Sequence, residues 1–300
     1  MDIEKSQIIR KIDEKKRIVE NDICNAWGSS GTGGRSENQD AYGGVTNGRN
    51  VILTVCDGMG GMAGGQTASH IAVVEILQTL IEISEDGMGE EAIVKAVENA
   101  NDAIYRRALN EPKLRGMGTT TTILVITPEC AYITHVGDSR IYQLRNGKKY
   151  FRTFDHSRVF ELVAQGTLTE EMARQSSFSN IITRALGMKT MVEFVVEKIP
   201  YKKGDRFLLC CDGVWNVTPE SEMLKLFMEK DKASEEVDYL TSTIDNIGWD
   251  QGGGHDNLTA IVVDIKQNSK YQYSVLELVK RSLNRKATQI KKLFKKNKAY

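Results

Sequence analysis

The chain has 300 residues, with 40 basic and 40 acidic side chains and the composition of an ordinary globular protein. No apolar run approaches the roughly 20 residues that cross a bilayer, and the charged N-terminus has no apolar signal segment. The five cysteines include no CxxC pair, which indicates reduced thiols in a cytoplasmic protein and argues against a zinc site. We therefore expect one large domain with a short extension at each end.

Strands and helices are predicted in groups. Residues 1–20 alternate charged and apolar side chains and predict a surface helix outside the core. Many strands joined by short turns, with helices between the groups, indicate antiparallel sheets flanked by helices, an α+β fold. The other predicted elements are strands at 23–27 and 51–56, helices at 67–81 and 90–109, strands at 120–126, 131–136 and 141–145, short helices within 155–190, strands at 192–198 and 206–211, helices near 219 and at 234–247, and a strand at 258–265.

Two apolar stretches, 51–58 and 206–213, are near copies, and both end in Asp-Gly. A carboxylate at the end of a buried strand lies at a sheet edge, and the glycine after it leaves room for a ligand. A third acid, Asp256, opens the last predicted strand. Three carboxylates that converge from separate strand ends, in a chain with four histidines, predict an all-oxygen metal site built on Asp57, Asp212 and Asp256.

The glycines that follow Asp57 allow a second interpretation. Gly58-x-Gly60-x-x-Ala63 nearly fits the dinucleotide-binding fingerprint, which follows a strand and opens a helix. That motif also needs an acid at the end of a second strand about 20 residues further on. Because the next predicted element is a helix, we favour the metal site.

Six short segments stand in a characteristic order and spacing. They are Arg35-x-x-Asn38-Gln39-Asp40, Asp57-Gly58-Met59-Gly60-Gly61, Gly118-Thr119-Thr120, Gly137-Asp138-Ser139-Arg140, Asp212-Gly213 and Asp256-Asn257-x-Thr259. Together they resemble the metal-dependent protein serine/threonine phosphatases of type 2C, in their bacterial form. The resemblance implies a four-layer αββα sandwich, with two antiparallel sheets between helices and a binuclear Mn²⁺ or Mg²⁺ site at one end. It places the phosphatase domain at 21–268 and a flap at about 155–190.

The resemblance also implies roles for single residues. Asp57 bridges both metals, the Gly58 carbonyl binds one of them, and Asp212 and Asp256 bind the other. Asp138 resembles the acid that holds a weaker third metal together with Asp212.

Other residues surround these ligands in the family. Asp40 orders metal-bound water, Gln39 and Asn257 stand next to it, and Arg35 clamps the substrate phosphate. Oxygen ligands select Mg²⁺ or Mn²⁺, and the chemistry expected is direct attack of water on a phosphoserine or phosphothreonine without a phospho-enzyme. Seen this way, Arg35, Asp40 and Asp57 are the candidate catalytic residues.

The chain departs from the family at two places near the site. Gln39 stands where many relatives have Glu, which predicts weaker binding of the second metal. Met59 and Met62 stand where relatives have a His, so we expect the leaving oxygen to take its proton from water. The alternative function is a pseudophosphatase, a binding module that keeps the fold. This alternative predicts that metal-binding acids have been lost, whereas all of these acids are present in the sequence.

The last segment, 269–300, is predicted to form a basic amphipathic helix. Residues 280–300 hold nine basic and no acidic side chains, so residues 1–279 carry a net charge of −9. Such a helix suits an anionic membrane surface or an acidic partner through 280–298, or it packs on its own domain. We expect phosphorylated proteins as substrates, an opposing Ser/Thr kinase, a monomer, and no nucleic-acid partner.

Overall fold

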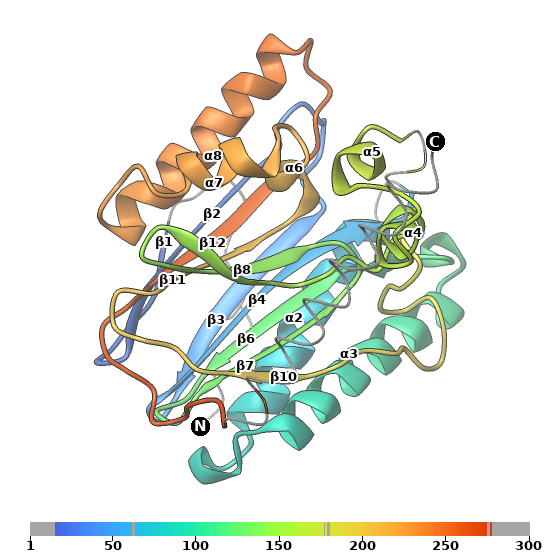
Figure 1. The fold of residues 1–300 in the computed structure, drawn as a ribbon. Coiled ribbons are helices and arrows are strands. Elements are labelled where there is room, and N and C mark those ends of the chain that lie inside the picture. Colours follow the sequence, from blue (N-terminus) through green and yellow to red (C-terminus); the bar gives the residue numbers. More distant parts are fainter. Residues whose placement is uncertain (1–15, 62–63, 177, 179–180, 275–276, 278–300) are drawn as a thin grey trace.

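The computed structural model describes residues 16–61, 64–176, 178, 181–274 and 277. Its strands form two six-stranded antiparallel sheets that lie face to face (Figure 1). The first sheet contains, in spatial order, β1 (Lys16–Glu20), β2 (Cys24–Gly31), β12 (Leu258–Ile265), β11 (Arg206–Cys210), β8 (Arg140–Arg145) and β9 (Lys148–Arg152). The second contains β10 (Glu197–Ile199), β7 (Ala131–Val136), β6 (Thr121–Ile126), β4 (Asn50–Met59) and β3 (Asp40–Asn47), with β5 (Gly118–Thr119) paired to the end of β4.

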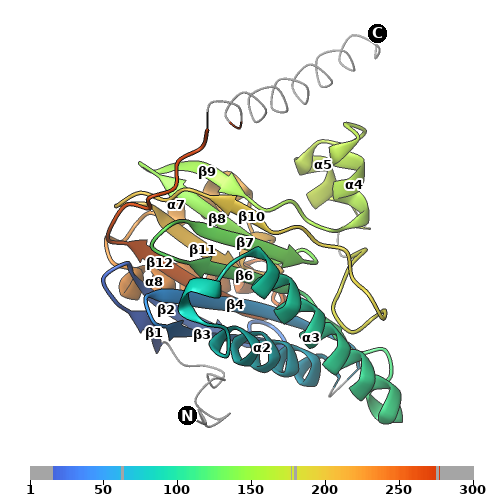
Figure 2. The same cartoon turned by 90° about the horizontal axis from the view of Figure 1, so that it is seen from below.

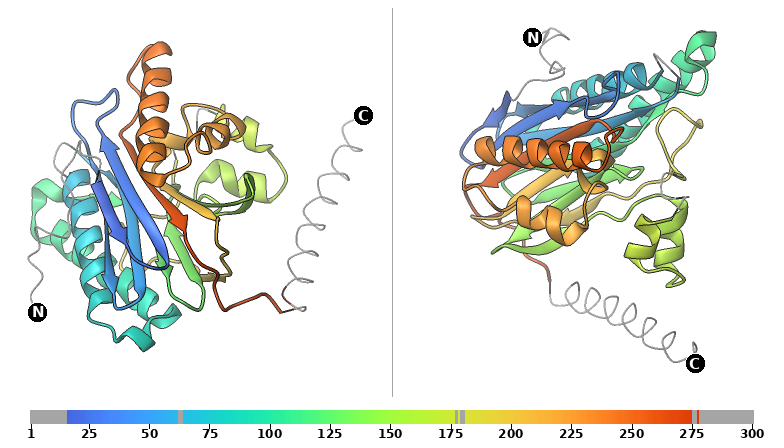
Figure 3. Two further views of the ribbon diagram at one scale, coloured as in Figure 1. Left: turned by 90° about the vertical axis from the view of Figure 1, so that its left-hand side faces the viewer. Right: turned by 90° about the horizontal axis from the view of Figure 1, so that it is seen from above.

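Helices cover the outer face of each sheet, which confirms the predicted four-layer α+β sandwich (Figure 3). The second sheet carries α2 (Gly64–Ile81) and α3 (Glu90–Asn110), and the first carries α6 (Asp212–Trp215), α7 (Glu220–Leu226) and α8 (Ala233–Asp250). Short 3₁₀ turns stand at η1 (Glu85–Gly87) and η2 (Pro112–Leu114). No helix within the described ranges is long and apolar enough to cross a membrane.

Three hydrophobic interfaces hold the four layers together. Along β4, Leu53 and Val55 face the other sheet, whereas Ile52 and Cys56 face α2 and α3. Successive side chains of a strand point to opposite faces, so a strand buried on both faces is a continuous apolar run. This is why the two near-copy stretches were recognisable as strands in the sequence.

Part of the predicted N-terminal helix is wrong. Residues 16–20 form the edge strand β1, which pairs with β2 and places Ile18 and Val19 in the core between the sheets. This pairing satisfies the backbone groups of β2, which would otherwise be an exposed sheet edge. Residues 1–15 lie outside the described residues, as does most of the predicted C-terminal helix, 278–300.

The strand predicted at 192–198 is also shorter than expected. Only Glu197–Ile199 pairs, with β7, and the preceding residues cross the molecule without regular structure. The alternating Val192, Phe194 and Val196 pack on the core beneath α3, so they bury apolar surface without a strand partner. The flap carries α4 (Arg158–Ala164) and α5 (Glu170–Arg174), which stand beside the sandwich (Figure 2).

Candidate metal centre

Four acids from separate elements line one cavity of about 540 Å³. Asp57 lies near the end of β4, Asp138 in the turn between β7 and β8, and Asp212 at the first residue of α6. Asp256 lies in the loop before β12. Gly58, Gln39, Arg35 and Asn257 line the same cavity, so the structure brings these predicted site residues together.

The Thr119–Thr120 segment fixes two of the acid-bearing turns. The Asp57 amide donates to the Thr120 hydroxyl at 3.0 Å, and the Asp57 carbonyl accepts from the Thr120 amide and the Thr119 hydroxyl, both at 2.8 Å. The Thr120 hydroxyl also lies 2.7 Å from that of Ser139, next to Asp138. The backbone of both acids is therefore held in place.

Asn257 fastens the loop that carries Arg35. Its side-chain nitrogen donates to the carbonyls of Thr32 and Glu37, both at 2.9 Å, and its side-chain oxygen accepts from the Gln39 amide at 2.8 Å. These three bonds span the loop from one end to the other. The sequence motif placed Asn257 beside the metal ligands, and the structure shows that its contact is with the loop.

Arg35 is half exposed and points to an acid of the site. Its Nη2 donates to Asp256 Oδ2 at 2.9 Å. Beneath it, Gly33 has a φ of 57°, and a Cβ there would lie 2.2 Å from the Asp256 carbonyl oxygen. Only glycine allows this close approach of the two loops.

Gly58 meets a similar restriction on the other side of the cavity. A Cβ on Gly58 would lie 2.1 Å from the carbonyl oxygen of Gly65 in the first turn of α2. Its amide donates to the Gln39 carbonyl at 3.2 Å, and the Ser69 hydroxyl donates to the same carbonyl at 2.6 Å. The Asp-Gly pair thus joins the end of β4 to the start of α2.

The acids carry more negative charge than the surrounding residues neutralise. Burial raises the pKa of Asp40 to about 6, and burial with the charge of Asp155 raises that of Asp138 to about 7. The pKa values of Asp57 and Asp212 rise well above their usual range because both are desolvated and close to other acids.

These residues fit a divalent cation. Among the described residues, neither carboxylate oxygen of Asp40 has a hydrogen-bond partner. Oδ1 of Asp212 also has none within the described part of the chain. Buried oxygens without partners are costly unless a cation or water satisfies them. No three Asp, Glu, His or Cys side chains in the described part of the chain are close enough to hold a metal ion as they stand. The donors are all hard oxygens, which suit Mg²⁺ or Mn²⁺.

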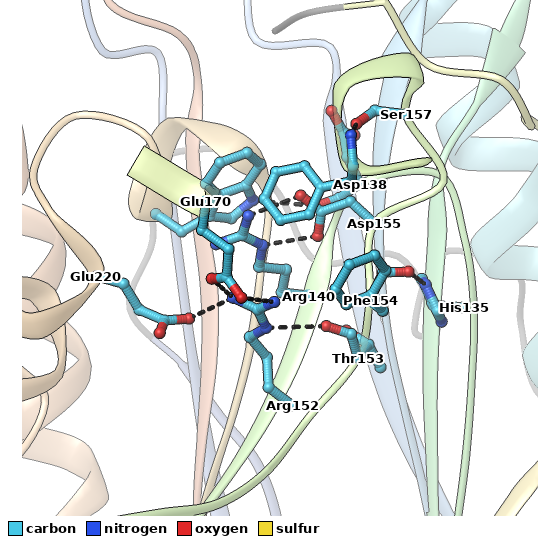
Figure 4. Close-up of polar contacts among 12 residues, drawn as sticks. His135, Asp138, Arg140, Arg152, Thr153, Phe154, Asp155, Ser157, Glu170 and Glu220 are labelled. Carbon is cyan, nitrogen blue, oxygen red and sulfur yellow. Dashed lines mark hydrogen bonds and ion pairs between the residues drawn. The ribbon is translucent and has the colours of Figure 1, made fainter. Parts of the chain in front are cut away.

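A buried ion pair connects the Asp138 turn to the flap (Figure 4). The Arg140 guanidinium donates to both carboxylate oxygens of Asp155, at 2.8 and 2.6 Å, and lies 3.4 Å over the Trp215 ring. The Trp215 indole in turn donates to the Asp138 carbonyl at 3.0 Å. The arginine of the Gly-Asp-Ser-Arg segment therefore positions Asp138 from behind.

Arg152 anchors the flap itself. Its guanidinium contacts Glu170, the first residue of α5, at 2.9 Å and Glu220, the first residue of α7, at 2.7 Å (Figure 4). Because Arg152 is almost fully buried, this bridge ties the flap to the first sheet and its helices. Nothing in the sequence motifs indicated this pairing.

The histidines near the site have structural contacts. His135 and His156 stack with ring centroids 4.3 Å apart, and burial lowers the pKa of His156 to about 3. His255, next to Asp256 in the chain, has its Nε2 2.7 Å from Asp245 and its ring in an edge-on contact with that of Trp249. No histidine lines the metal cavity among the described residues.

The fold and these acids define a metal-dependent phosphatase, and comparison with known proteins agrees. The protein phosphatase 2C family matches residues 28–278, and the chain belongs to that family. The chain is 35% identical to the serine/threonine phosphatase stp of Listeria monocytogenes over 234 residues. This aligned region covers 77% of this chain and 91% of that protein. Its activity is accordingly that of a phosphoprotein phosphatase.

Solved structures give the same result. The Mycobacterium tuberculosis serine/threonine phosphatase PstP/Ppp superposes with a TM-score of 0.68 and 30% identity, over 82% of this chain and all of that one. The catalytic domain of PstP in complex with two manganese ions gives a TM-score of 0.66 at 30% identity, over 81% of this chain and 98% of that one.

Proposed function

We propose that the protein hydrolyses phosphoserine and phosphothreonine in other proteins at a binuclear centre built on Asp57, Asp212 and Asp256. The observation that supports this is the convergence of these acids and Arg35 on one cavity. The PstP structure with two manganese ions supports a two-metal site of this kind.

Each acid has a proposed role. Asp57 would be shared by both cations, the Gly58 carbonyl would bind one of them, and Asp212 and Asp256 would hold the other. Asp138, with Asp212, would hold a third, weaker cation. When bound, the cations lower the pKa of water and offset charge on the phosphoryl oxygens.

The remaining residues bind and orient. Arg35, half exposed at the cavity rim, offers a planar guanidinium that matches phosphate oxygens. Asp40, buried opposite Asp57, would accept hydrogen bonds from metal-bound water. The bond between the Gln39 amide and Asn257 holds one end of the loop that carries Arg35. No histidine among the described residues lines the metal cavity, so water is the proposed source of the proton for the leaving oxygen.

Release of phosphate from a phosphothreonine peptide tests this proposal. We expect turnover with Mn²⁺ or Mg²⁺, none with EDTA, and at least about a hundredfold loss in Asp212→Asn, the scale of removing one electrostatic contact from a transition state. Folded wild-type protein that shows no turnover with either metal would favour the pseudophosphatase alternative. An Asp212→Asn variant with full activity at equal metal occupancy would contradict the assigned ligands.

The C-terminal segment gives a second proposal. We propose that the protein is cytoplasmic and that the basic residues of 280–298 bind anionic membrane surfaces, since residues 280–300 include nine basic and no acidic side chains. Sedimentation with phosphatidylserine vesicles, with and without residues 278–300, tests this. Equal sedimentation of both forms would contradict membrane binding. It would favour an acidic partner or packing of this segment on its own domain.

A further inference from the structure

A second groove opens directly from the metal cavity. Its volume is about 450 Å³, and Met59 and Ile182 line both hollows. Its remaining apolar wall comes from Ala185 and Met188, near the end of the flap, and from Val192 just after it. A chain whose phosphorylated residue occupies the metal cavity therefore passes this apolar wall on one side.

The charges of the groove cancel. Two acids, Glu161 and Glu193, and two bases, Arg184 and Lys189, stand around its rim. Arg184 also donates to the Glu193 carbonyl at 3.1 Å and lies 3.5 Å from its carboxylate, so this pair is satisfied internally. The groove thus offers no net charge to attract an acidic or a basic side chain.

The groove wall is fixed to the metal site. Leu186 and Thr119 exchange two backbone hydrogen bonds, at 3.2 and 2.9 Å, and Thr119 pairs with Gly58 in the β4–β5 ladder. The buried Asn101 of α3 accepts from the Gly187 amide at 2.9 Å and donates to the Lys189 carbonyl at 3.0 Å. The wall is therefore held in place without a ligand, which lowers the entropic cost of binding.

Exposed apolar side chains are frequent in the stretch of chain that supplies most of the groove's lining. Among the described residues, ten large apolar side chains are exposed, and seven of them lie between residues 154 and 195. Met188 is 51% exposed within the groove. Exposed apolar surface of this kind is typical of an interaction site, and the residues that the groove shares with the metal cavity make the substrate its occupant.

Another hollow that adjoins the metal cavity is mainly polar. A hollow of about 310 Å³ shares Arg35, Asp212 and Asp256 with the metal cavity and continues past Asn216 and Gln251. The two hollows that adjoin the metal cavity therefore differ in chemistry. Only the groove of Met188 and Val192 offers an apolar wall to a bound peptide.

We propose that the enzyme prefers phosphopeptides with an aliphatic side chain close to the phosphorylated residue, and that the groove of Met188 and Val192 binds this side chain. The inference rests on the proposed phosphatase function. An aliphatic side chain is the expected occupant because the groove is large enough for it and has no net charge that would attract an ionic side chain.

The test uses the full chain with Mn²⁺ and phosphothreonine peptides that carry Leu or Asp at one flanking position at a time. Leu at one flank is expected to raise kcat/KM by about fivefold to tenfold over Asp, as expected for partial burial of one aliphatic side chain. In Met188→Ser and Val192→Ser this preference falls to about twofold or less. Equal kcat/KM for Leu and Asp at every flanking position, or a preference for Asp, would overturn the proposal.

Matched controls lie in the same segment. Met191 and Val195 are exposed and do not line the groove, so Met191→Ser and Val195→Ser should keep the wild-type preference for Leu. Loss of the preference in these controls as well would contradict the assignment to the groove. Hydrolysis of p-nitrophenyl phosphate distinguishes failure of the phosphatase function from failure of the groove assignment. Absence of turnover contradicts the phosphatase function. Turnover of this compound without a preference for Leu in the peptides contradicts only the groove assignment.

Discussion

Asp40 and Asp57 stand directly opposite each other in the antiparallel pair of β3 and β4. Directly opposed residues share a face of the sheet, so two carboxylates meet there with little solvent. Burial raises the pKa of Asp40, with a smaller contribution from the charge of Asp256, and burial together with the charge of Asp40 raises the pKa of Asp57. The fold thus stores an unfavourable interaction that a bound cation would relieve.

Asparagine at position 40 should therefore stabilise the metal-free protein. At pH 7.5 in EDTA, we expect the Tm of Asp40→Asn to exceed that of the wild type by about 2–5 °C, because one buried charge is removed. Differential scanning calorimetry measures this difference. With Mn²⁺ present, the order should reverse, since the variant loses an acid that helps the site; a lower Tm of the variant in EDTA would contradict the repulsion.

Loss of Asn257 should loosen the loop that carries Arg35. Asn257→Ala leaves the Gln39 amide and two carbonyls without their partner, and we expect the free energy of unfolding to fall by about 2–4 kcal/mol. Urea denaturation gives this value, and KM for a phosphopeptide should rise at the same time. Asn99→Ala is the matched control, because Asn99 makes a single bond, to Thr79; an equal loss there would show that the effect is not specific to the loop.

Arg35 should contribute to substrate binding. Arg35→Ala removes the guanidinium from the cavity rim, and kcat/KM for a phosphopeptide should fall by about 10- to 100-fold, the range of one lost charge-assisted contact. The control is Arg49→Ala, whose exposed side chain pairs with Glu85 away from the cavity. Mn²⁺ affinity should be unchanged or higher in Arg35→Ala, because Asp256 is released from its pair; unchanged kcat/KM would remove Arg35 from the site.

His156 should make stability depend on pH. Its pKa is lowered to about 3 by burial, so the unfolded chain binds a proton below about pH 6.5 that the folded chain does not. The folded state therefore loses stability as the pH falls from 6.5 toward 3, by about 1–2 kcal/mol at pH 5 for this half-buried ring. Urea denaturation at pH 7.5 and 5.0 should show a smaller decrease in His156→Gln than in the wild type. Equal decreases would place the pH dependence elsewhere.

The sequence predicted most of the strands, and it missed β1, β3, β5 and β9. β4, β11 and β12 are apolar throughout because both faces are covered. β3 escaped detection because Gly43 and Gly44 interrupt it; a Cβ on Gly44 would lie 2.4 Å from a methyl carbon of Leu53, so close packing excludes a larger residue there. Strand β1 carries charged residues at its ends, and the alternation of charged and apolar residues over 1–20 predicts a helix there instead of a strand.

The acids of the site were predictable because each follows or precedes a recognisable strand. Their supports were not, since they depend on pairs that are far apart in the chain. Asn257 contacts a loop more than 200 residues away, and Arg152 reaches Glu220 across 68 positions. Such pairs are set by the topology of the two sheets, which short motifs do not encode.

The most direct test of the central claim is a count of bound Mn²⁺ by isothermal titration calorimetry at pH 7.5. We expect two sites in the wild type, and a lost or at least about tenfold weakened site in Asp57→Asn, Asp212→Asn and Asp256→Asn. Asp245→Asn, outside the cavity lining, serves as the control and should bind like the wild type. Wild-type stoichiometry and affinity in all three cavity variants would contradict a metal centre built on these acids.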